Sequence, residues 1–519
     1  MNVDGETDLA EHSSAAASVR EPEAASAGLH KSATSLTRQS WLLIALISVV
    51  LLIPCFWLPK IEAGDLASHV YNAWLASLVV KGQAPGISIA PQTNNILADV
   101  LLLKLGVALG FAAAEKIVTG FAVLLFFWSS FALVSAFAKQ LAWPFVPLLA
   151  MFAYGWTFHM GFLNFYLALG FSFVGLAILW SMRVRSWWIL IPLAGLIWMA
   201  HPLGFLWFLG AGAYLVAVKF LPARWHWVPF TGAVLAVFAL RTYLVHRYET
   251  VPWGGHIYAL NGTDQIRFVG DERYPYVAMA VLLVVGGWLL SYLWKIRSHA
   301  GGWKSFLSVP LQLFLIGLVT LPFFPDFVML PQYAEPVGFL CLRFSLTIAI
   351  LGCCALSAVR PGMIFAVITA CIAIAFFSLV YRDAARTWRM EQQAQALVKQ
   401  LPEGARVMST IFRFHGSPMF VHHVVDRACI GRCFSVDNYE PYTKQFRLRA
   451  AVGNRIVSAS AEDANHMAFG DYLVRDTDLP TWQIFQCGPT EIDLCARPLH
   501  PGSLLNFIPS EAIRGRKVQ

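Results

Sequence analysis

Charged residues are scarce in this chain of 519 residues: Asp, Glu, Lys and Arg make up 13% of it, whereas hydrophobic residues make up 57%. An average soluble domain has about 25% charged residues, so this composition excludes an ordinary soluble protein and indicates a chain that crosses a membrane many times. We expect the net charge of +8 to come from Lys and Arg in loops beside the membrane. No nucleic-acid partner is expected.

Motifs of several soluble enzyme classes are also absent. The sequence has no P-loop, no dinucleotide-binding fingerprint, no Gly-x-Ser-x-Gly and no His-Glu-x-x-His. These absences leave soluble-nucleotide chemistry and zinc proteolysis without support, and no nucleotide cofactor is expected. The sequence names no metal ligands, although a requirement for a divalent metal stays open.

The charges that are present divide the chain into three parts. Residues 1–38 hold six acids and three bases and are rich in Ala, Ser and Glu, which predicts a disordered cytoplasmic tail. Residues 39–381 carry only 28 of the 68 charged side chains and are predicted to form a multi-pass membrane domain. Residues 382–519 carry 31, and candidate helices and strands among them predict a small soluble domain of mixed α and β structure.

Apolar stretches of membrane-spanning length predict a polytopic α-helical membrane protein with about ten to twelve transmembrane helices. The first is a retained anchor from Ser40 to Leu58, and segments near 97–113 and 142–158 are among the others. Basic residues precede the anchor and acids follow it, which favours a cytoplasmic N-terminus in the cell membrane. The first loop, residues 60–96, and the C-terminal domain are then expected to be extracytoplasmic.

The first loop contains an unusual polar stretch, Glu62-Ala-Gly-Asp65-Leu-Ala-Ser-His69-Val-Tyr-Asn72. From Asp65 onward apolar residues recur at helical spacing, while Asp65, His69 and Asn72 fall on the opposite stripe. This pattern predicts an amphipathic helix at the membrane surface, with Asp65 and His69 one turn apart. The alternative is structural: Asp65 caps the helix and His69 faces lipid headgroups.

Other polar residues interrupt later hydrophobic stretches. Lys104 lies in the next span, and ionisable residues at membrane depth usually face a protein interior or a water-filled cavity. Structural roles are the alternative for each, such as a packed His201 or an Arg343 that reaches the headgroups. The long loop from Glu249 to Pro275 either contributes to a site or covers the helices. The residues predicted to bind substrate are Glu62, Asn72, Lys104, His201, Arg241, His256 and Arg343.

Several of these features together resemble the GT-C superfamily of integral-membrane glycosyltransferases. They are the acidic motif around Asp65, the surface helix, the entry to the second span at Pro91-Gln-Thr-Asn-Asn95, the many apolar segments and the C-terminal domain. Protein mannosyltransferases and the aminoarabinose transferases of lipid A belong to that superfamily. Many members carry two adjacent acids in the first loop, whereas here Glu62 precedes Asp65 by three residues.

The resemblance implies a hexose or pentose donor on polyprenyl phosphate, reached through membrane lipid, and a lipid, glycan or protein acceptor on the extracytoplasmic side. Asp65 is then the candidate general base and His69 its candidate catalytic partner. Lys104, His201, Arg241 and Arg343 are candidates to stabilise the phosphate that leaves. The alternative function is a non-enzymatic lipid or polysaccharide transporter, or flippase, gated by Asp65 and His69.

Four cysteines fall in the C-terminal domain, at positions 429, 433, 487 and 495. An even number in a domain expected outside the cytoplasm favours one or two disulfides over a zinc site, because the spacings do not fit a zinc ribbon. Three histidines of this domain, His415, His422 and His423, are expected in exposed loops.

Overall fold

The structure is a computed structural model that describes residues 38–181, 184–255, 257–268, 272–297, 308–411, 421–487, 490 and 492–505. The chain divides into two compact units, Met1–Val50 and Leu51–Gln519. The boundary falls within the helix α2, Arg38–Phe56, and all later elements belong to the second unit. The predicted tail lies outside the described residues except for Arg38.

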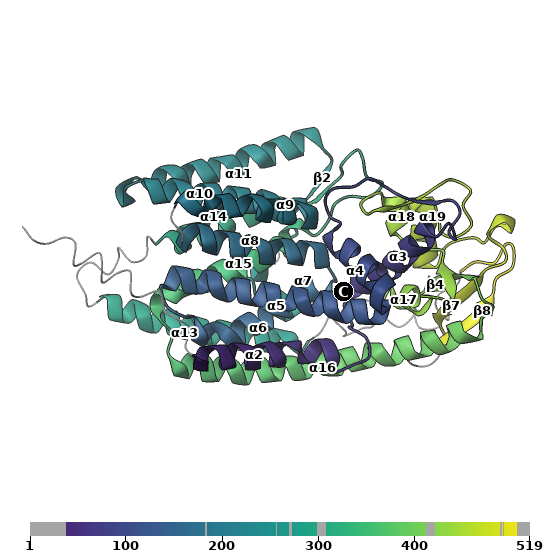
Figure 1. The fold of residues 1–519 in the computed structure, drawn as a ribbon, viewed down its shortest axis with the longest axis horizontal. Helices are drawn as coiled ribbons and strands as arrows, with labels where there is room; N and C mark the ends of the chain where they lie inside the picture. The colour runs from purple at the N-terminus through teal and green to yellow at the C-terminus, as the bar shows by residue number, and fades with distance from the viewer. Residues whose placement is uncertain are drawn as a thin grey trace, which may run out of the picture. The chain divides into compact units, whose positions relative to one another are not determined.

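Eight helices of the described part are long and apolar enough to cross a membrane. They are α2, α5 (Phe111–Ala138), α8 (Leu163–Ser181), α10 (Pro202–Phe220), α11 (Trp227–Arg247), α13 (Tyr274–Arg297), α15 (Leu340–Leu356) and α16 (Met363–Gln400). Two shorter apolar helices are α9 (Leu190–Ala200) and α14 (Val309–Phe323). The chain is therefore a polytopic helical membrane protein, and helices α5, α8, α10, α11 and α15 run side by side (Figure 1).

The number of full-length spans differs from the ten to twelve predicted. The segment near 97–113 contains a helix of only 13 residues, α4 (Leu97–Leu109). The segment near 142–158 is divided into η1 (Trp143–Phe145), α6 (Val146–Ala153) and α7 (Trp156–His159). Its helix ends before Gly155, where a Cβ would lie 3.0 Å from the carbonyl oxygen of Gln265. A distant segment therefore interrupts this span, which sequence periodicity does not reveal.

That distant segment is the long loop after α11, and much of it is buried rather than forming a surface cover. It contains β2 (Thr250–Pro252), which pairs antiparallel with β3 (Pro325–Val328), and then η4 (Ile257–Asn261) and α12 (Asp264–Arg267). Gln265 accepts a hydrogen bond from the Thr157 backbone amide at 3.0 Å and donates one to Ser345 at 2.7 Å. The loop thus joins α7 to α15.

The C-terminal part contains a four-stranded mixed sheet in the order β5-β4-β7-β8. Strand β4 (Ala405–Thr410) is parallel to β5 (Cys433–Ser435) and β7 (Trp482–Gln486), and β8 (Leu494–Pro498) is antiparallel to β7. The long helix α16 runs from among the spans to this sheet (Figure 1). The predicted domain boundary at residue 382 therefore lies inside one continuous helix, Met363–Gln400.

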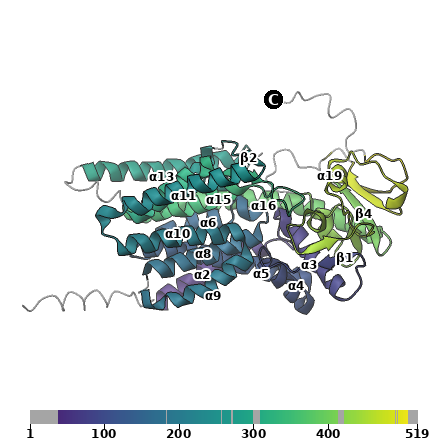
Figure 2. The same cartoon turned by 90° about the horizontal axis from the view of Figure 1, so that it is seen from above.

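The first loop packs against this C-terminal part (Figure 2). Strand β1 (Ile87–Ile89) pairs antiparallel with β6 (Leu448–Ala450), and α3 (Gly64–Val80) shares a hydrophobic core with α16 and β4. Both faces of α3 are buried, His69 and Asn72 included. The prediction of a helix is confirmed, and protein covers the polar stripe that was expected to face a membrane surface.

The remaining elements are short. They are α17 (Val424–Ala428), α18 (Glu440–Thr443), α19 (Ala461–Phe469), η2 (Val184–Ile189), η3 (Ala223–Trp225), η6 (Ser357–Val359) and η7 (Asp476–Asp478).

Candidate functional site

Asp65 lies in the first turn of α3 and is held there by a tight contact with the turn between α7 and α8. The Asp65 amide donates to the carbonyl of Met160 at 3.0 Å. Gly161 has a φ of +78°, and a Cβ at this position would lie 2.6 Å from the Asp65 nitrogen, so only glycine fits. The N-cap residue is Ala63, and the cap has no side-chain hydrogen bond. The alternative that Asp65 caps the helix is therefore wrong.

Two cavities meet at Asp65 and Phe162, which line both. The first, here called the Arg343 pocket, has a volume of about 140 Å³ and lies among α3, α8, α10 and α15. The second, here called the His423 pocket, has a volume of about 260 Å³ and is lined mainly by the C-terminal part of the chain. The Asp65 side chain is 23% exposed, so its carboxylate is accessible from these spaces.

The Arg343 pocket contains a cation with unused donors. The Arg343 guanidinium lies 3.7 Å from the centre of the Phe162 ring, and its Nε is buried without a partner among the described residues. Its Nη1 lies 3.3 Å from Nε2 of His201. His201 Nδ1 accepts from the Leu203 amide at 3.1 Å, so Nε2 carries the proton of a neutral ring and cannot accept from Arg343. Arg343 can thus donate to an anionic ligand.

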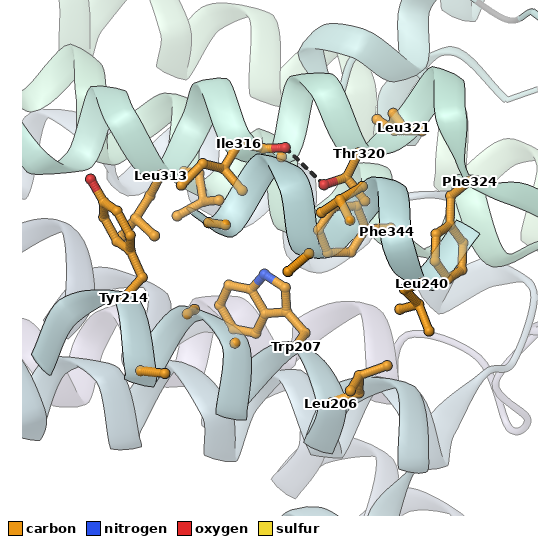
Figure 3. Close-up of a pocket in the computed structure, with 18 of the residues that line it drawn as sticks. Leu206, Trp207, Tyr214, Leu240, Leu313, Ile316, Thr320, Leu321, Phe324 and Phe344 are labelled. Carbon is orange, nitrogen blue, oxygen red and sulfur yellow. Dashed lines mark hydrogen bonds between the residues drawn. The ribbon is translucent and has the colours of Figure 1, made fainter. Parts of the chain in front are cut away.

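Figure 3 shows an apolar cavity, which has a volume of about 530 Å³ and adjoins the Arg343 pocket through shared lining residues. Leu203 and Leu340 line both spaces. The walls come from α10, α11, α14 and α15, and Trp207 and Phe344 are among their large side chains. A ligand with an anionic head and a long apolar tail matches this pair of spaces.

His69 is turned toward a buried carboxylate group rather than toward Asp65. Its Nδ1 lies 2.9 Å from Asp99 Oδ1 and 3.2 Å from Glu440 Oε1, and the side chain of His69 is 4% exposed. Burial lowers the pKa of His69, but the two carboxylates outweigh it and raise the pKa well above its ordinary value. Burial raises the pKa of Glu440 to about 7. A charged His69 thus joins α3 to α4 and α18 at the edge of the Arg343 pocket.

His423, which the sequence analysis expected in an exposed loop, is instead the imidazole near Asp65. Its side chain is only 17% exposed, and its Nε2 lies 3.7 Å from Asp65 Oδ1. Its Nδ1 lies 2.8 Å from Asp426 Oδ2. Burial lowers the pKa of His423, but Asp426 and then Asp65 raise it above the ordinary value. Sequence spacing gave no signal, because Asp65 and His423 lie 358 positions apart in the chain.

Two serines donate hydrogen bonds to carboxylates that line the His423 pocket. Ser435 donates to Asp426 at 2.5 Å, and Ser409 donates to Asp437 at 2.8 Å. Burial and then the charge of Asp426 raise the pKa of Asp437 to about 6. The pocket therefore combines carboxylates, hydroxyls and imidazole in a confined space.

Two predicted substrate-binding residues instead hold the first loop to other segments. Glu62 Oε2 lies 3.2 Å from Nη2 of Arg427, which also contacts Glu115 and Glu391, and all four side chains are buried. Burial raises the pKa of Glu62 to about 8 despite the nearby Arg427. The Asn72 amide exchanges hydrogen bonds of 2.7 and 3.1 Å with that of Asn438.

The other predicted residues are dispersed. Lys104 on α4 and Arg241 on α11 are exposed, and neither lines the two pockets. His201 and Arg343 are brought together in the Arg343 pocket. His256 and His415 lie outside the described residues.

The four cysteines of the C-terminal part form two disulfides. Cys429 pairs with Cys433 and Cys487 pairs with Cys495, so the prediction of disulfides is confirmed. Within the described ranges, no group of three or more His, Cys, Asp and Glu side chains has an arrangement that could hold a metal ion.

Comparisons with models of known protein families, with curated proteins and with solved structures gave no significant match.

Proposed function

We propose that the protein transfers a sugar from a polyprenyl-phosphate donor to an acceptor hydroxyl, with Asp65 as the general base. The observation that carries this proposal is the position of Asp65, between a cationic pocket that adjoins an apolar cavity and a second, carboxylate-rich pocket. A base at such a junction can contact two substrates that enter from different directions.

The donor fits the first two spaces by its chemistry. An isoprenoid chain requires an apolar environment, which the cavity beside Leu203 and Leu340 supplies. The phosphate requires hydrogen-bond donors and positive charge, which Arg343 supplies at the head of that cavity. The sugar would then lie within the Arg343 pocket, with its anomeric carbon toward Asp65.

The reaction needs one proton acceptor and one site for negative charge. The acceptor oxygen forms a bond to the anomeric carbon while the bond from that carbon to the phosphate oxygen breaks. The acceptor proton moves to the Asp65 carboxylate, and the electron pair of the broken bond stays on the phosphate beside Arg343. Such general-base assistance contributes typically about 10²–10⁴-fold.

His423 is a positioning residue in this scheme. Held by Asp426 at 2.8 Å, its ring presents Nε2 toward the Asp65 carboxylate. A protonated His423 attracts that carboxylate and holds its orientation.

The proposal is tested with the full-length protein reconstituted in liposomes that contain polyprenyl-phosphate hexoses and pentoses labelled in the sugar. We expect label to pass to a soluble or lipid-linked glycan acceptor. A protein that moves the labelled lipid between leaflets and forms no product with any acceptor would contradict the proposal and support the transporter alternative.

A further inference from the structure

We infer that the His423 pocket binds an uncharged, hydroxyl-rich acceptor, a sugar or a cyclitol, and discriminates against acceptors that carry a phosphate or carboxylate. This inference rests on the proposed function, because it assigns the acceptor to the pocket on the far side of Asp65 from the donor. It narrows the acceptor from any lipid, glycan or protein to one chemical class.

The charge of the pocket is the first observation. Four carboxylates line it, and none of the described lining residues is Lys or Arg. The carboxylates are those of Asp65, Glu335, Asp426 and Asp437. A protonated His423 offsets one of these charges, and an anionic group placed here would still meet repulsion from the remaining carboxylates at low dielectric. Arg343 lines the other pocket, where the donor phosphate is expected.

The second observation is a hydroxyl that lacks a partner. The Tyr439 hydroxyl is buried, and no described residue hydrogen-bonds to it. Tyr439 lines the pocket, and its ring is tilted by 35° against the His423 ring with 5.0 Å between centres. A buried polar atom without a partner is destabilising, so a ligand hydroxyl that pairs with it is favoured. The aromatic ring of Tyr439 offers an apolar surface to the C–H face of a sugar.

The carboxylates of the pocket favour neutral hydroxyl groups, which donate hydrogen bonds, over a cationic ligand. Asp426 already accepts from Ser435 and lies 2.8 Å from His423, and Asp437 already accepts from Ser409. Their negative charge is partly balanced by these donors, while each carboxylate keeps lone pairs for a further hydroxyl. A sugar or cyclitol carries several hydroxyls on one ring, and these can donate hydrogen bonds to the free lone pairs of the Asp426 and Asp437 carboxylates.

Binding is measured without any donor, by isothermal titration calorimetry of the full-length protein in lipid nanodiscs. The probes are methyl α-mannopyranoside, methyl α-glucopyranoside and myo-inositol, with mannose 6-phosphate, glucose 6-phosphate, inositol 1-phosphate and glucosamine as charged counterparts. We expect at least one neutral probe to bind at least about tenfold more tightly than its phosphate. Equal or tighter binding of the phosphates or of glucosamine, or no binding by any neutral probe, would overturn the inference.

Two variants connect the binding to this pocket. Tyr439→Phe removes the unpaired hydroxyl and should weaken the neutral probe about three- to tenfold. Tyr472→Phe is the matched control, because that hydroxyl donates to Asp478 at 2.9 Å outside the pocket, and it should leave the affinity unchanged. Glu335→Gln should reduce the discrimination against the phosphate about fivefold. Unchanged binding in both Tyr439→Phe and Glu335→Gln would place the ligand elsewhere.

The outcomes separate this inference from the proposed function. Binding of neutral probes by a protein that transfers no sugar would keep the pocket assignment and overturn the transferase. Sugar transfer to phosphorylated acceptors as fast as to neutral ones would keep the transferase and overturn the acceptor class.

Discussion

Arg343 is the only Lys or Arg among the described residues that line its pocket, and no described carboxylate lies within ion-pair distance of its guanidinium. A half-buried cation without an anionic partner is costly, so its presence here suits a site that is completed by an anionic ligand. The neighbouring His201 cannot accept a hydrogen bond from Arg343, because its Nδ1 already accepts one from the Leu203 amide at the start of α10.

Replacing Arg343 with Gln should lower kcat/KM for the donor about tenfold to one hundredfold, since hydrogen bonds to a charged group contribute about 1.5–3 kcal/mol. Arg343→Lys keeps the charge without the planar fork and should recover only part of the loss. Steady-state transfer rates over a range of donor concentrations measure this. Arg241→Gln is the control, an exposed Arg on α11 that lines neither pocket, and an equal loss in that variant would contradict the assignment.

The charge state of His423 should make transfer activity depend on pH. It faces the carboxylates of Asp65, Asp426 and Asp437 and the Tyr439 ring, and the nearest carboxylates raise its pKa. A raised pKa means that the charged form is present below that pKa and is lost as the pH rises through it. We therefore expect transfer activity to fall on the alkaline side.

In His423→Gln this alkaline decline in kcat/KM should disappear, with an overall loss of about tenfold at neutral pH. A variant that retains the alkaline decline of the native protein would assign it to another group. His466→Gln, which changes an exposed imidazole of α19, serves as the control.

At the scale of elements, α3 and α17 are joined to the membrane helices by buried charges. Arg427 on α17 contacts Glu62 before α3, Glu115 on α5 and Glu391 on α16. With one Arg among three carboxylates, protonation of one acid reduces the repulsion. Glu62 is the one that burial favours in its neutral form, since its pKa is raised to about 8.

This cluster predicts how stability changes with pH. The folded state keeps a proton on Glu62 that the unfolded chain, with a carboxyl pKa of 4.5, has released. Stability contributed by Glu62 is thus present below pH 4.5 and is lost as pH rises toward about 8. The Gln side chain in Glu62→Gln cannot titrate. Between about pH 5.5 and about pH 8.5, the unfolding temperature of this variant should therefore fall less than that of the native protein, by on the order of 3 °C. Thermal unfolding in detergent measures this change of unfolding temperature with pH. Glu462→Gln, at an exposed position, is the control. The same change with pH in Glu62→Gln and in the native protein would contradict the account.

The same elements show what the sequence could predict. Composition predicts the membrane class, periodicity predicts α3, and the polar stretch singles out Asp65. Periodicity cannot say what covers a helix, so the burial of His69 and Asn72 was missed. The contacts of His423 with Asp65, and of Arg427 with Glu62 and Glu115, were missed because each pair lies more than 300 residues apart in the chain. Only the folded structure brings these residues together.

At the scale of the whole molecule, the site depends on both ends of the chain. The first loop supplies Asp65, the central spans supply Arg343, and residues after α16 supply His423. The pairing of β1 with β6 and the continuity of α16 join these parts. Prediction from sequence treats them as separate domains, because the charge density changes near residue 382.

The disulfides predict on which side of the membrane the site lies. Disulfides such as Cys429–Cys433 and Cys487–Cys495 form and persist in oxidising compartments, so we expect the His423 pocket to lie outside the cytoplasm. Peptide mapping by mass spectrometry without reduction should find both linkages in protein taken from cells, with Cys341 and Cys353 as unpaired internal references. Four free thiols at positions 429, 433, 487 and 495 would contradict an extracytoplasmic site.

The rate of sugar transfer by Asp65→Asn tests the central claim most directly. Asn keeps the shape of Asp and cannot accept the acceptor proton, so we expect a loss of about 10²–10⁴-fold in kcat with normal membrane insertion and unchanged donor binding. Asp476→Asn, the same change at an exposed position, should transfer at the native rate. Native turnover by Asp65→Asn would contradict the account.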